Sequence, residues 1–170
     1  MRTTSVGILP RVLILDTGPL WELILYSAVH NLYFKRLEPE LRFVRTALEY
    51  RRLTEFISSF PRRTTTPHVV AEISRKTRGT ERKGHAQIWG IVYEEFRQMR
   101  MDEELVKLLS MPRDLVAKMG VVDVSIRDLG LRLASTQPLV LSVDSALVSE
   151  CQKQRVEVRL LSEVISGLNP

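Results

Sequence analysis

The sequence predicts an α/β fold, a three-layer α/β/α sandwich with a central, mainly parallel sheet. Short apolar runs rich in branched residues alternate with longer stretches of helical periodicity, which is typical of parallel sheets covered by helices. The runs at residues 11–16 and 139–144 are almost entirely apolar, as expected for central strands that are buried on both faces. With 170 residues, of which 44% are apolar, the chain can bury a full core, so we expect a single domain over residues 1–170.

The first half of the chain predicts two strands and four helices. The first apolar run ends in Asp16, and Gly18 and Pro19 soon after it mark the end of the strand. Pro19 also suits the first turn of the next helix. Apolar residues at intervals of three or four predict the later helices, and Pro61 stops one of them. The expected strands are residues 11–16 and 62–67. The expected helices are residues 20–31, 38–59, a segment from residue 68 to a break at 78–80, and 85–99. The first two of these helices form an extended helical region at about residues 20–61.

The second half repeats the alternation. Residues 105–110 fit either a strand or a helix. Gly120 separates two predicted helices, and the acidic Asp123 near the start of the second one suits the helix dipole. The run that ends in Asp144 has the same pattern as the first strand. The expected strands are residues 139–144 and 156–160. The expected helices are residues 112–119, 122–134, 145–153 and a last turn at 161–167.

The charge of the chain is unevenly distributed. The net charge is +5 and the pI is near 9.7. Between Arg51 and Lys83, nine residues are basic and only three are acidic. Such a region attracts polyanions, although a solvated basic helix face would give the same pattern. Cys151 is the single cysteine, which excludes an internal disulfide and a multi-cysteine zinc site and favours a reducing cytosol.

No stretch of the sequence predicts a membrane span or a secretory signal. The most apolar stretch, residues 12–25, contains Asp16, Gly18, Pro19 and Glu22, whereas a spanning helix needs about 20 mostly apolar residues. The N-terminal sequence MRTTSVGILP lacks the apolar region and the cleavage site of a signal peptide. We therefore expect a cytoplasmic protein with no membrane segment.

Four acidic residues are predicted to meet at one edge of the sheet. Asp16 and Asp144 end apolar strands, and sites in open α/β sheets lie outside the carboxyl ends of the strands. Glu72 and Asp123 lie near the starts of predicted helices, which lie at that same edge. Carboxylates that converge repel one another, so the group needs raised pKa values or a cation, and Mg²⁺ or Mn²⁺ prefers such oxygen ligands. Taken alone, Glu72 and Asp123 are more simply explained as helix caps or surface charges, whereas this explanation is weaker for Asp16, which ends an apolar strand.

Four segments of the chain, in order, resemble the successive motifs of PIN-domain nucleases, many of which are toxins of VapC-type toxin–antitoxin modules. The segments are ILDTGPL (14–20), TPHVVAEI (66–73), GVVDVSI (120–126) and LVLSVDSALV (139–148). Together they span nearly the whole chain. The resemblance implies a compact α/β/α sandwich around a parallel sheet and cleavage of RNA with Mg²⁺ or Mn²⁺.

The resemblance also implies a role for each matching residue. Asp16 matches the first acid, a direct metal ligand, and Glu72 matches a helical acid that often acts through water or a second metal. Asp123 and Asp144 match the third and fourth acids. Two polar residues match positions that support these acids. They are Thr17 and Ser142. Asp128, five residues after Asp123, is a rival for the third position.

The function implied is that of a metal-dependent endoribonuclease with RNA as its substrate. Basic residues after the helical acid would hold the RNA backbone through contacts that do not depend on sequence. They are Arg75, Lys76, Arg78, Arg82 and Lys83. If the chain is a toxin, its partner is a protein antitoxin, and a homodimer is expected. The extended region at residues 20–61 is longer than in small PIN toxins, where this region serves dimerisation, antitoxin binding or substrate choice.

Two other functions remain open. One is a PIN-like protein that binds RNA or a partner without cleaving, which the loss of an acid would favour, whereas all four acids are present. The other is a different α/β enzyme, such as a phosphatase that forms an aspartyl phosphate. Such enzymes need a second aspartate two residues after the strand-end aspartate, and Gly18 occupies that place.

Overall fold

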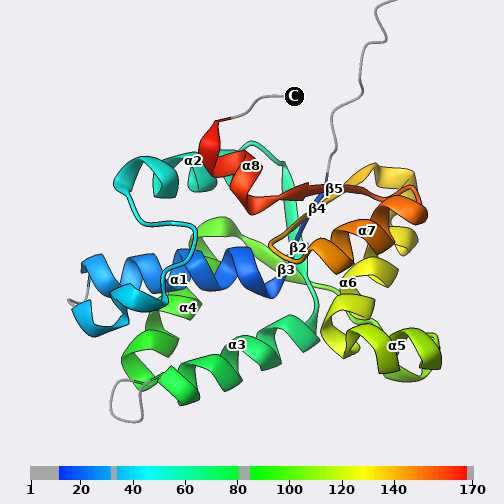
Figure 1. Cartoon of the computed structure of the whole chain (residues 1–170), viewed down its shortest axis with the longest axis horizontal. Coiled ribbons are helices and arrows are strands. Elements are labelled where there is room, and N and C mark those ends of the chain that lie inside the picture. Colours follow the sequence, from blue (N-terminus) through cyan, green and yellow to red (C-terminus); the bar gives the residue numbers. More distant parts are fainter. Residues whose placement is uncertain (1–11, 32–33, 81–84, 168–170) are drawn as a thin grey trace, which may run out of the picture.

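The computed structural model describes residues 12–31, 34–80 and 85–167. Its centre is a parallel five-stranded sheet with the strand order β3-β2-β1-β4-β5, flanked by helices (Figure 1). This confirms the predicted α/β class and its three-layer arrangement. The strands are β1 (Val12–Leu15), β2 (Arg62–Thr65), β3 (Met101–Glu103), β4 (Pro138–Ser142) and β5 (Glu157–Leu160).

The two central strands are the apolar runs of the sequence. All four residues of β1 and all five of β4 are buried, and the register pairs Leu15 with Leu141. The chain builds β2 and β3 on one side of β1 and then crosses back to place β4 on the other side. In a parallel sheet, such a reversal of strand order opens a crevice at the carboxyl ends of the two strands. The crevice of this sheet therefore lies after Leu15 and Ser142.

The helices are α1 (Thr17–Asn31), α2 (Ala47–Ser58), α3 (Pro67–Thr80), α4 (His85–Met99), α5 (Arg113–Met119), α6 (Val121–Arg132), α7 (Ser145–Lys153) and α8 (Leu161–Ser166). Helix α1 is buried over most of its length and packs against α2, α3 and α4 (Figure 1). Helix α6 packs against β1 and β4 and contacts α5 and α7. None of the helices in the described ranges is long and apolar enough to cross a membrane.

The prediction of one helix over residues 38–59 is wrong in its first half. Residues 35–40 form a 3₁₀ helix, an irregular segment follows, and α2 begins only at Ala47. Thr46 caps α2 in a capping box with Glu49, which fixes the start of the helix. The carboxylate of Glu22 accepts the backbone N–H groups of residues 42–44, which holds that segment out of helical geometry.

Four smaller features also differ from what the sequence predicts. Helix α1 begins at Thr17 rather than at residue 20, and α3 runs through the expected break and ends at Thr80. Strand β3 was not predicted, because its sequence MDE is short, has two acids among its three residues, and lies at the edge of the sheet. Residues 105–110 form neither an α-helix nor a strand and end in a 3₁₀ turn at Leu108–Ser110.

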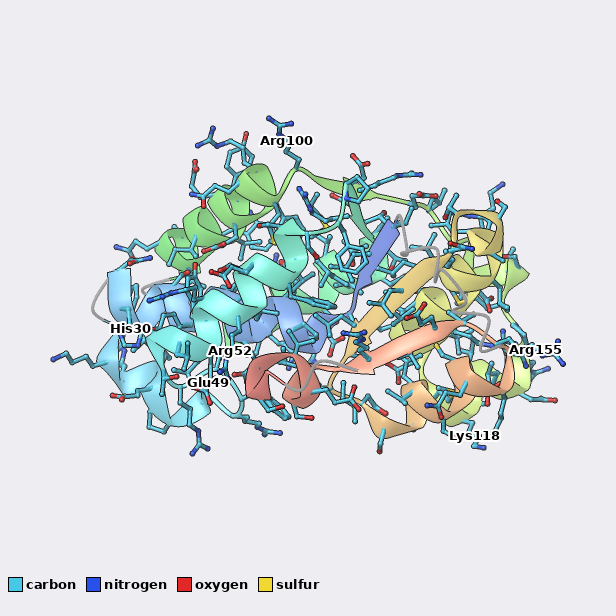
Figure 2. The ribbon with its side chains drawn as sticks, turned by 90° about the horizontal axis from the view of Figure 1, so that it is seen from above. His30, Glu49, Arg52, Arg100, Lys118 and Arg155 are labelled. Carbon is cyan, nitrogen blue, oxygen red and sulfur yellow. The ribbon has the colours of Figure 1, made fainter. Side chains whose placement is uncertain are left out.

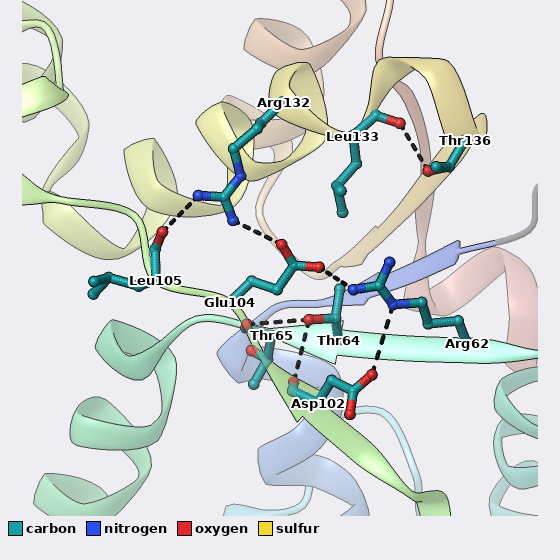
Figure 3. A network of polar contacts seen from close by, with 9 residues as sticks. All are labelled: Arg62, Thr64, Thr65, Asp102, Glu104, Leu105, Arg132, Leu133 and Thr136. Atoms are coloured by element: carbon teal, nitrogen blue, oxygen red, sulfur yellow. Dashed lines mark hydrogen bonds and ion pairs between the residues drawn. The ribbon is translucent and has the colours of Figure 1, made fainter.

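Charged residues join the β2–β3 edge to α6 (Figure 3). The Glu104 carboxylate accepts hydrogen bonds from Arg62 and, at 2.8 Å, from Arg132, whose guanidinium also donates to the Leu105 carbonyl. Arg62 lies 3.6 Å from the Asp102 carboxylate as well. Each acid of this group therefore has an arginine partner. We call it the edge cluster.

Two short connections use backbone conformations that are uncommon for residues with a side chain. Arg100 and Arg155 have φ angles of 49° and 59° and follow the ends of α4 and α7. Each turns the chain from a helix towards the next strand, and both side chains point outward from the periphery (Figure 2). The left-handed region normally favours glycine, so these arginines hold tight turns at a small cost in stability.

Candidate functional site

The predicted acids lie around the crevice at the carboxyl ends of β1 and β4. Asp16 directly follows β1, and Asp144 lies two residues after β4. Glu72 is in the second turn of α3, and Asp123 is in the first turn of α6. Both helices begin at this edge, because α3 follows β2 almost directly and α6 packs against β1 and β4. We call this group the acidic crevice.

Asp16 is the most deeply placed acid of the crevice. Its side chain is buried, and its two oxygens accept hydrogen bonds of 2.6 Å from the Thr17 backbone N–H and the Ser142 hydroxyl. Burial raises its pKa from 3.8 to about 6. The hydrogen bonds from Ser142 and Thr17 partly offset this rise, whereas the charges of Glu72 and Asp144 add to it.

Ser142 connects Asp16 to Asp144. Its buried Oγ donates to Asp16 and accepts the backbone N–H of Asp144 at 2.9 Å. The Asp144 Oδ1 in turn accepts the N–H groups of Ala146 and Leu147, at 2.6 and 3.0 Å, and so caps α7. Asp144 is therefore a helix cap whose second carboxylate oxygen takes no part in the cap.

Glu72 is held at the crevice by Thr17. The Thr17 hydroxyl donates to Glu72 Oε2 at 2.9 Å, across 55 residues of sequence. The other oxygen, Oε1, lies 3.5 Å from Nη2 of Arg75, whose side chain is largely exposed. The two supporting residues of the predicted site, Thr17 and Ser142, thus each contact two of its acids.

Asp123 completes the electrostatic group. Burial raises its pKa from 3.8 to about 7, and the charges of Asp16, Asp144 and Glu72 raise it further. No hydrogen bond from any described residue is among the causes of this shift. The four acids come from four separate segments of the chain, and the other three act on Asp123. The pKa shifts of Asp16 and Asp123 have the sign that burial and nearby negative charge produce.

Sequence reasoning missed a layer of hydroxyl residues below the acids. Thr66 and Ser125 share a buried hydrogen bond of 2.8 Å, which joins the start of α3 to α6. Ser125 also donates to the Val122 carbonyl, and Thr65 donates to the Leu15 carbonyl at 2.7 Å. These bonds position the segments that carry Glu72 and Asp123. The run of three threonines at residues 64–66 was the available signal, because all three are fully buried.

The structure also separates Asp128 from the site. Asp128 pairs with the neighbouring Arg127, whose Nε lies 3.8 Å from Glu150 on α7. The charges that raise the pKa values of Asp16 and Asp123 do not include Asp128. Asp123 is therefore the α6 acid that belongs to the acidic crevice.

The predicted RNA-binding residues are only partly described. Arg75 and Arg78 are exposed on α3, and Arg75 lies beside Glu72. Lys76 is half-buried, with its ammonium 5.8 Å from the centre of the Trp21 ring. Arg82 and Lys83 lie outside the described residues.

The acidic crevice offers oxygen donors of the kind that Mg²⁺ and Mn²⁺ prefer. In the conformation described, no three Asp, Glu, His or Cys side chains in the described ranges are arranged as a metal site. Both oxygens of Asp16 and one oxygen of Asp144 accept hydrogen bonds. The chemistry of the donors nevertheless fits a divalent cation, because burial and the charges of the neighbouring acids raise the pKa values of Asp16 and Asp123, and such an ion would offset both effects.

Comparisons of the chain with family models, with curated proteins and with solved structures gave no match.

Proposed function

We propose that the chain is a divalent-metal-dependent endoribonuclease of the PIN-domain type, which hydrolyses RNA phosphodiester bonds at the acidic crevice. The observation that carries the proposal is the position of Asp123 among three other acids. Asp123 has a pKa raised to about 7 by burial and by the charges of Asp16, Asp144 and Glu72. Four carboxylates at the switch point of a parallel sheet form a site that favours a cation and a substrate phosphate. The order of the four PIN-like motifs supports the same function.

The residues of the chain have distinct tasks in this proposal. Ser142 and the Thr17 amide fix the Asp16 carboxylate, and the Thr17 hydroxyl fixes Glu72, so two acids are oriented before substrate arrives. A bound Mg²⁺ or Mn²⁺ ion, held by Asp16, Glu72, Asp123 and Asp144, would supply Lewis acidity that makes water more acidic and offsets charge on the phosphate. Exposed Arg75 and Arg78 attract the RNA backbone towards the crevice.

Cleavage of a labelled single-stranded RNA tests this function directly. Wild type should cut in Mn²⁺ or Mg²⁺ and should not cut in EDTA. Asp123→Asn should lower the cleavage rate by roughly 100-fold or more, since it removes charge from the group without removing a hydrogen bond. The matched control is Asp128→Asn, the same change on the same helix outside the crevice, which should cleave like wild type. Asp144→Asn is the second variant, with a melting curve to separate loss of the α7 cap from loss of activity.

A second candidate function is RNA or partner binding without cleavage. It is favoured by the hydrogen bonds that already occupy both oxygens of Asp16 and one oxygen of Asp144. Folded, metal-supplemented wild type that binds several RNAs and cuts none of them would support this function and contradict the nuclease.

We also propose that the chain is the toxin of a type II toxin–antitoxin module, neutralised by a protein antitoxin. In this proposal it acts in the cytoplasm as a homodimer. Expression of wild type in a bacterial host should arrest growth, and expression of Asp123→Asn should not. Size-exclusion chromatography with light scattering tests the dimer. Equal growth with both chains would count against the toxin and leave the ribonuclease to the cleavage assay.

A further inference from the structure

A cavity of about 360 Å³ lies beside the acidic crevice, between α1, α3 and the irregular segment before α2. Resting on the ribonuclease function, we propose that this cavity binds the nucleoside next to the scissile phosphate, with its base against the aromatic wall. We call it the nucleoside cavity. Its lining residues are Gly18, Trp21, Glu22, Pro39, Glu40, Arg42, Phe43, Lys76 and Val143.

The nucleoside cavity and the acidic crevice share a wall. Gly18 lies two residues after Asp16, and Val143 lies between Ser142 and Asp144. The Val143 side chain fills the space where a Cβ on residue 18 would stand, so only glycine allows these two segments to pack this closely. Lys76 is one helical turn after Glu72 on α3. A ligand in the cavity is therefore immediately next to whatever occupies the crevice.

A buried acid holds the opposite wall in place. Glu22 is only 4% exposed, and its carboxylate accepts the backbone N–H groups of Arg42 at 3.0 Å, Phe43 at 2.9 Å and Val44 at 2.9 Å. These bonds to a carboxylate fix the segment from α1, about 20 residues away in sequence. The Glu22 carboxylate is thus occupied by backbone N–H groups of the protein itself. Phe43 and Arg42 are thus presented on a rigid wall.

The lining residues suit a nucleotide better than a simple anion or an apolar ligand. Phe43 is half-buried and offers an aromatic side chain, and the Trp21 ring lies deeper, with the Lys76 ammonium near its face. Arg42 and Lys76 bring positive charge suited to phosphate. Glu40 adds an exposed carboxylate that can accept a hydrogen bond from an exocyclic base amine. Aromatic side chains that stack on a base, combined with cations, are the usual composition of single-strand binding sites.

Binding is measured apart from cleavage, so that the cavity is tested whatever the fate of the nuclease. A fluorescently labelled single-stranded RNA is titrated in EDTA with the Asp123→Asn chain, and anisotropy gives its Kd. Adding Phe43→Ala should weaken binding by roughly 5- to 150-fold, the range for the loss of one base–aromatic stack. Phe43→Leu, which keeps most of the apolar volume, should weaken it comparably, and circular dichroism checks that both variants fold.

The matched control is Tyr93→Ala, an aromatic residue of α4 that is 66% exposed and does not line the cavity. It should bind RNA like the parent chain. If Phe43→Ala and Phe43→Leu also bind like the parent, the cavity does not hold a base and the proposal is wrong. If the parent chain binds no RNA, the proposal is wrong as well, and a protein side chain becomes the better occupant.

A second experiment locates the base relative to the cut. A series of RNAs carries one abasic nucleotide at successive positions around a cleavage site, and wild type is compared with Phe43→Ala in Mn²⁺. In wild type, cleavage should slow only when the abasic position adjoins the scissile phosphate, and this penalty should disappear in Phe43→Ala. Cleavage with no positional penalty would refute the nucleoside cavity and keep the nuclease. RNA binding that depends on Phe43, without any cleavage, would support the nucleoside cavity and contradict the nuclease.

Discussion

The molecule contains two groups of acids that are built in opposite ways. In the edge cluster, Glu104 contacts two arginines, Arg62 and Arg132, and Asp102 lies near the first of them (Figure 3). In the acidic crevice, Asp16 is hydrogen-bonded to a hydroxyl and an amide, and Asp123 faces three other acids. The first group is internally compensated and joins two layers of the fold. The second gathers four carboxyl groups at the switch point of the sheet, where burial and neighbouring acids raise the pKa values of Asp16 and Asp123.

The largest expected effect tests whether this contrast is functional. Asp16→Asn should reduce metal-dependent RNA cleavage by roughly 100-fold or more, because the buried side chain at position 16 loses the charge with which it would bind the metal ion. Glu104→Gln, the same chemical change in the edge cluster, should retain cleavage within about threefold of wild type. Rates under single-turnover conditions make the comparison. Equal losses in the two variants would mean that the crevice has no special role.

The next prediction concerns pH. Because the folded-state pKa values of Asp16 and Asp123 are raised to about 6 and about 7, the folded chain binds more protons than the unfolded chain between pH 4 and these values. In EDTA, the free energy of unfolding should therefore fall as the pH rises from 4 to 8. The buried Asp16 alone contributes on the order of 3 kcal/mol.

Denaturant titrations in EDTA at several pH values measure that fall. Added Mg²⁺ or Mn²⁺ should restore stability at pH 8 and do little at pH 4.5, since protonated acids bind cations poorly. Asp16→Asn should flatten the profile, and Glu104→Gln should leave its shape unchanged. A wild-type profile that rises from pH 4 to 8 would contradict the view that the crevice holds uncompensated charge.

Ser142→Ala sharpens the comparison from inside the crevice. It keeps all four acids but removes the donor to Asp16 and the acceptor for the Asp144 N–H. We expect a loss of about 1–3 kcal/mol in the free energy of unfolding and a cleavage rate roughly tenfold lower. The control is Ser135→Ala, the same substitution on the exposed turn after α6, which should change neither stability nor cleavage. Unchanged cleavage would show that orientation of Asp16 is unimportant.

The smallest effect belongs to the edge cluster. Arg132→Ala removes one arginine from Glu104, and both side chains are partly exposed, so solvent screens their interaction. The free energy of unfolding should fall by about 0.2–1 kcal/mol, and cleavage should not change. A thermal melt and the RNA assay check both parts. A large loss of activity would mean that this cluster also serves the site.

The sequence predicted the parts of the fold that depend on local patterns. The apolar runs that became β1 and β4, and the aspartates that follow them, could be recognised because central parallel strands are buried on both faces. The irregular segment before α2 could not, since its conformation depends on Glu22, which lies about 20 residues earlier. Strand β3 could not be recognised either, because its sequence has no apolar pattern.

The acids of the crevice were predicted one by one, but their relations required the structure. That Thr17 holds Glu72 and that Ser142 joins Asp16 to Asp144 follows from the order of strands, which the residue pattern alone does not give. Asp128 and Asp123 are on the same helix, and only the contact of Asp128 with Arg127 separates them. The Thr66–Ser125 bond joins residues 59 positions apart, so the run of threonines at residues 64–66 can be seen in the sequence but the partner of Thr66 cannot.

The pairing of β1 with β4 has a consequence for the time at which the acidic crevice assembles. Asp16 is synthesised more than 120 residues before Ser142 and Asp144. Long-range parallel pairing forms late, because the intervening chain must first be ordered. A nascent chain on the ribosome therefore holds its acids apart until β4 has emerged and inserted beside β1. For a protein that we propose cuts RNA, this topology delays assembly of the proposed site until β4 has been synthesised, and so spares the message and the ribosome during the synthesis of the preceding residues.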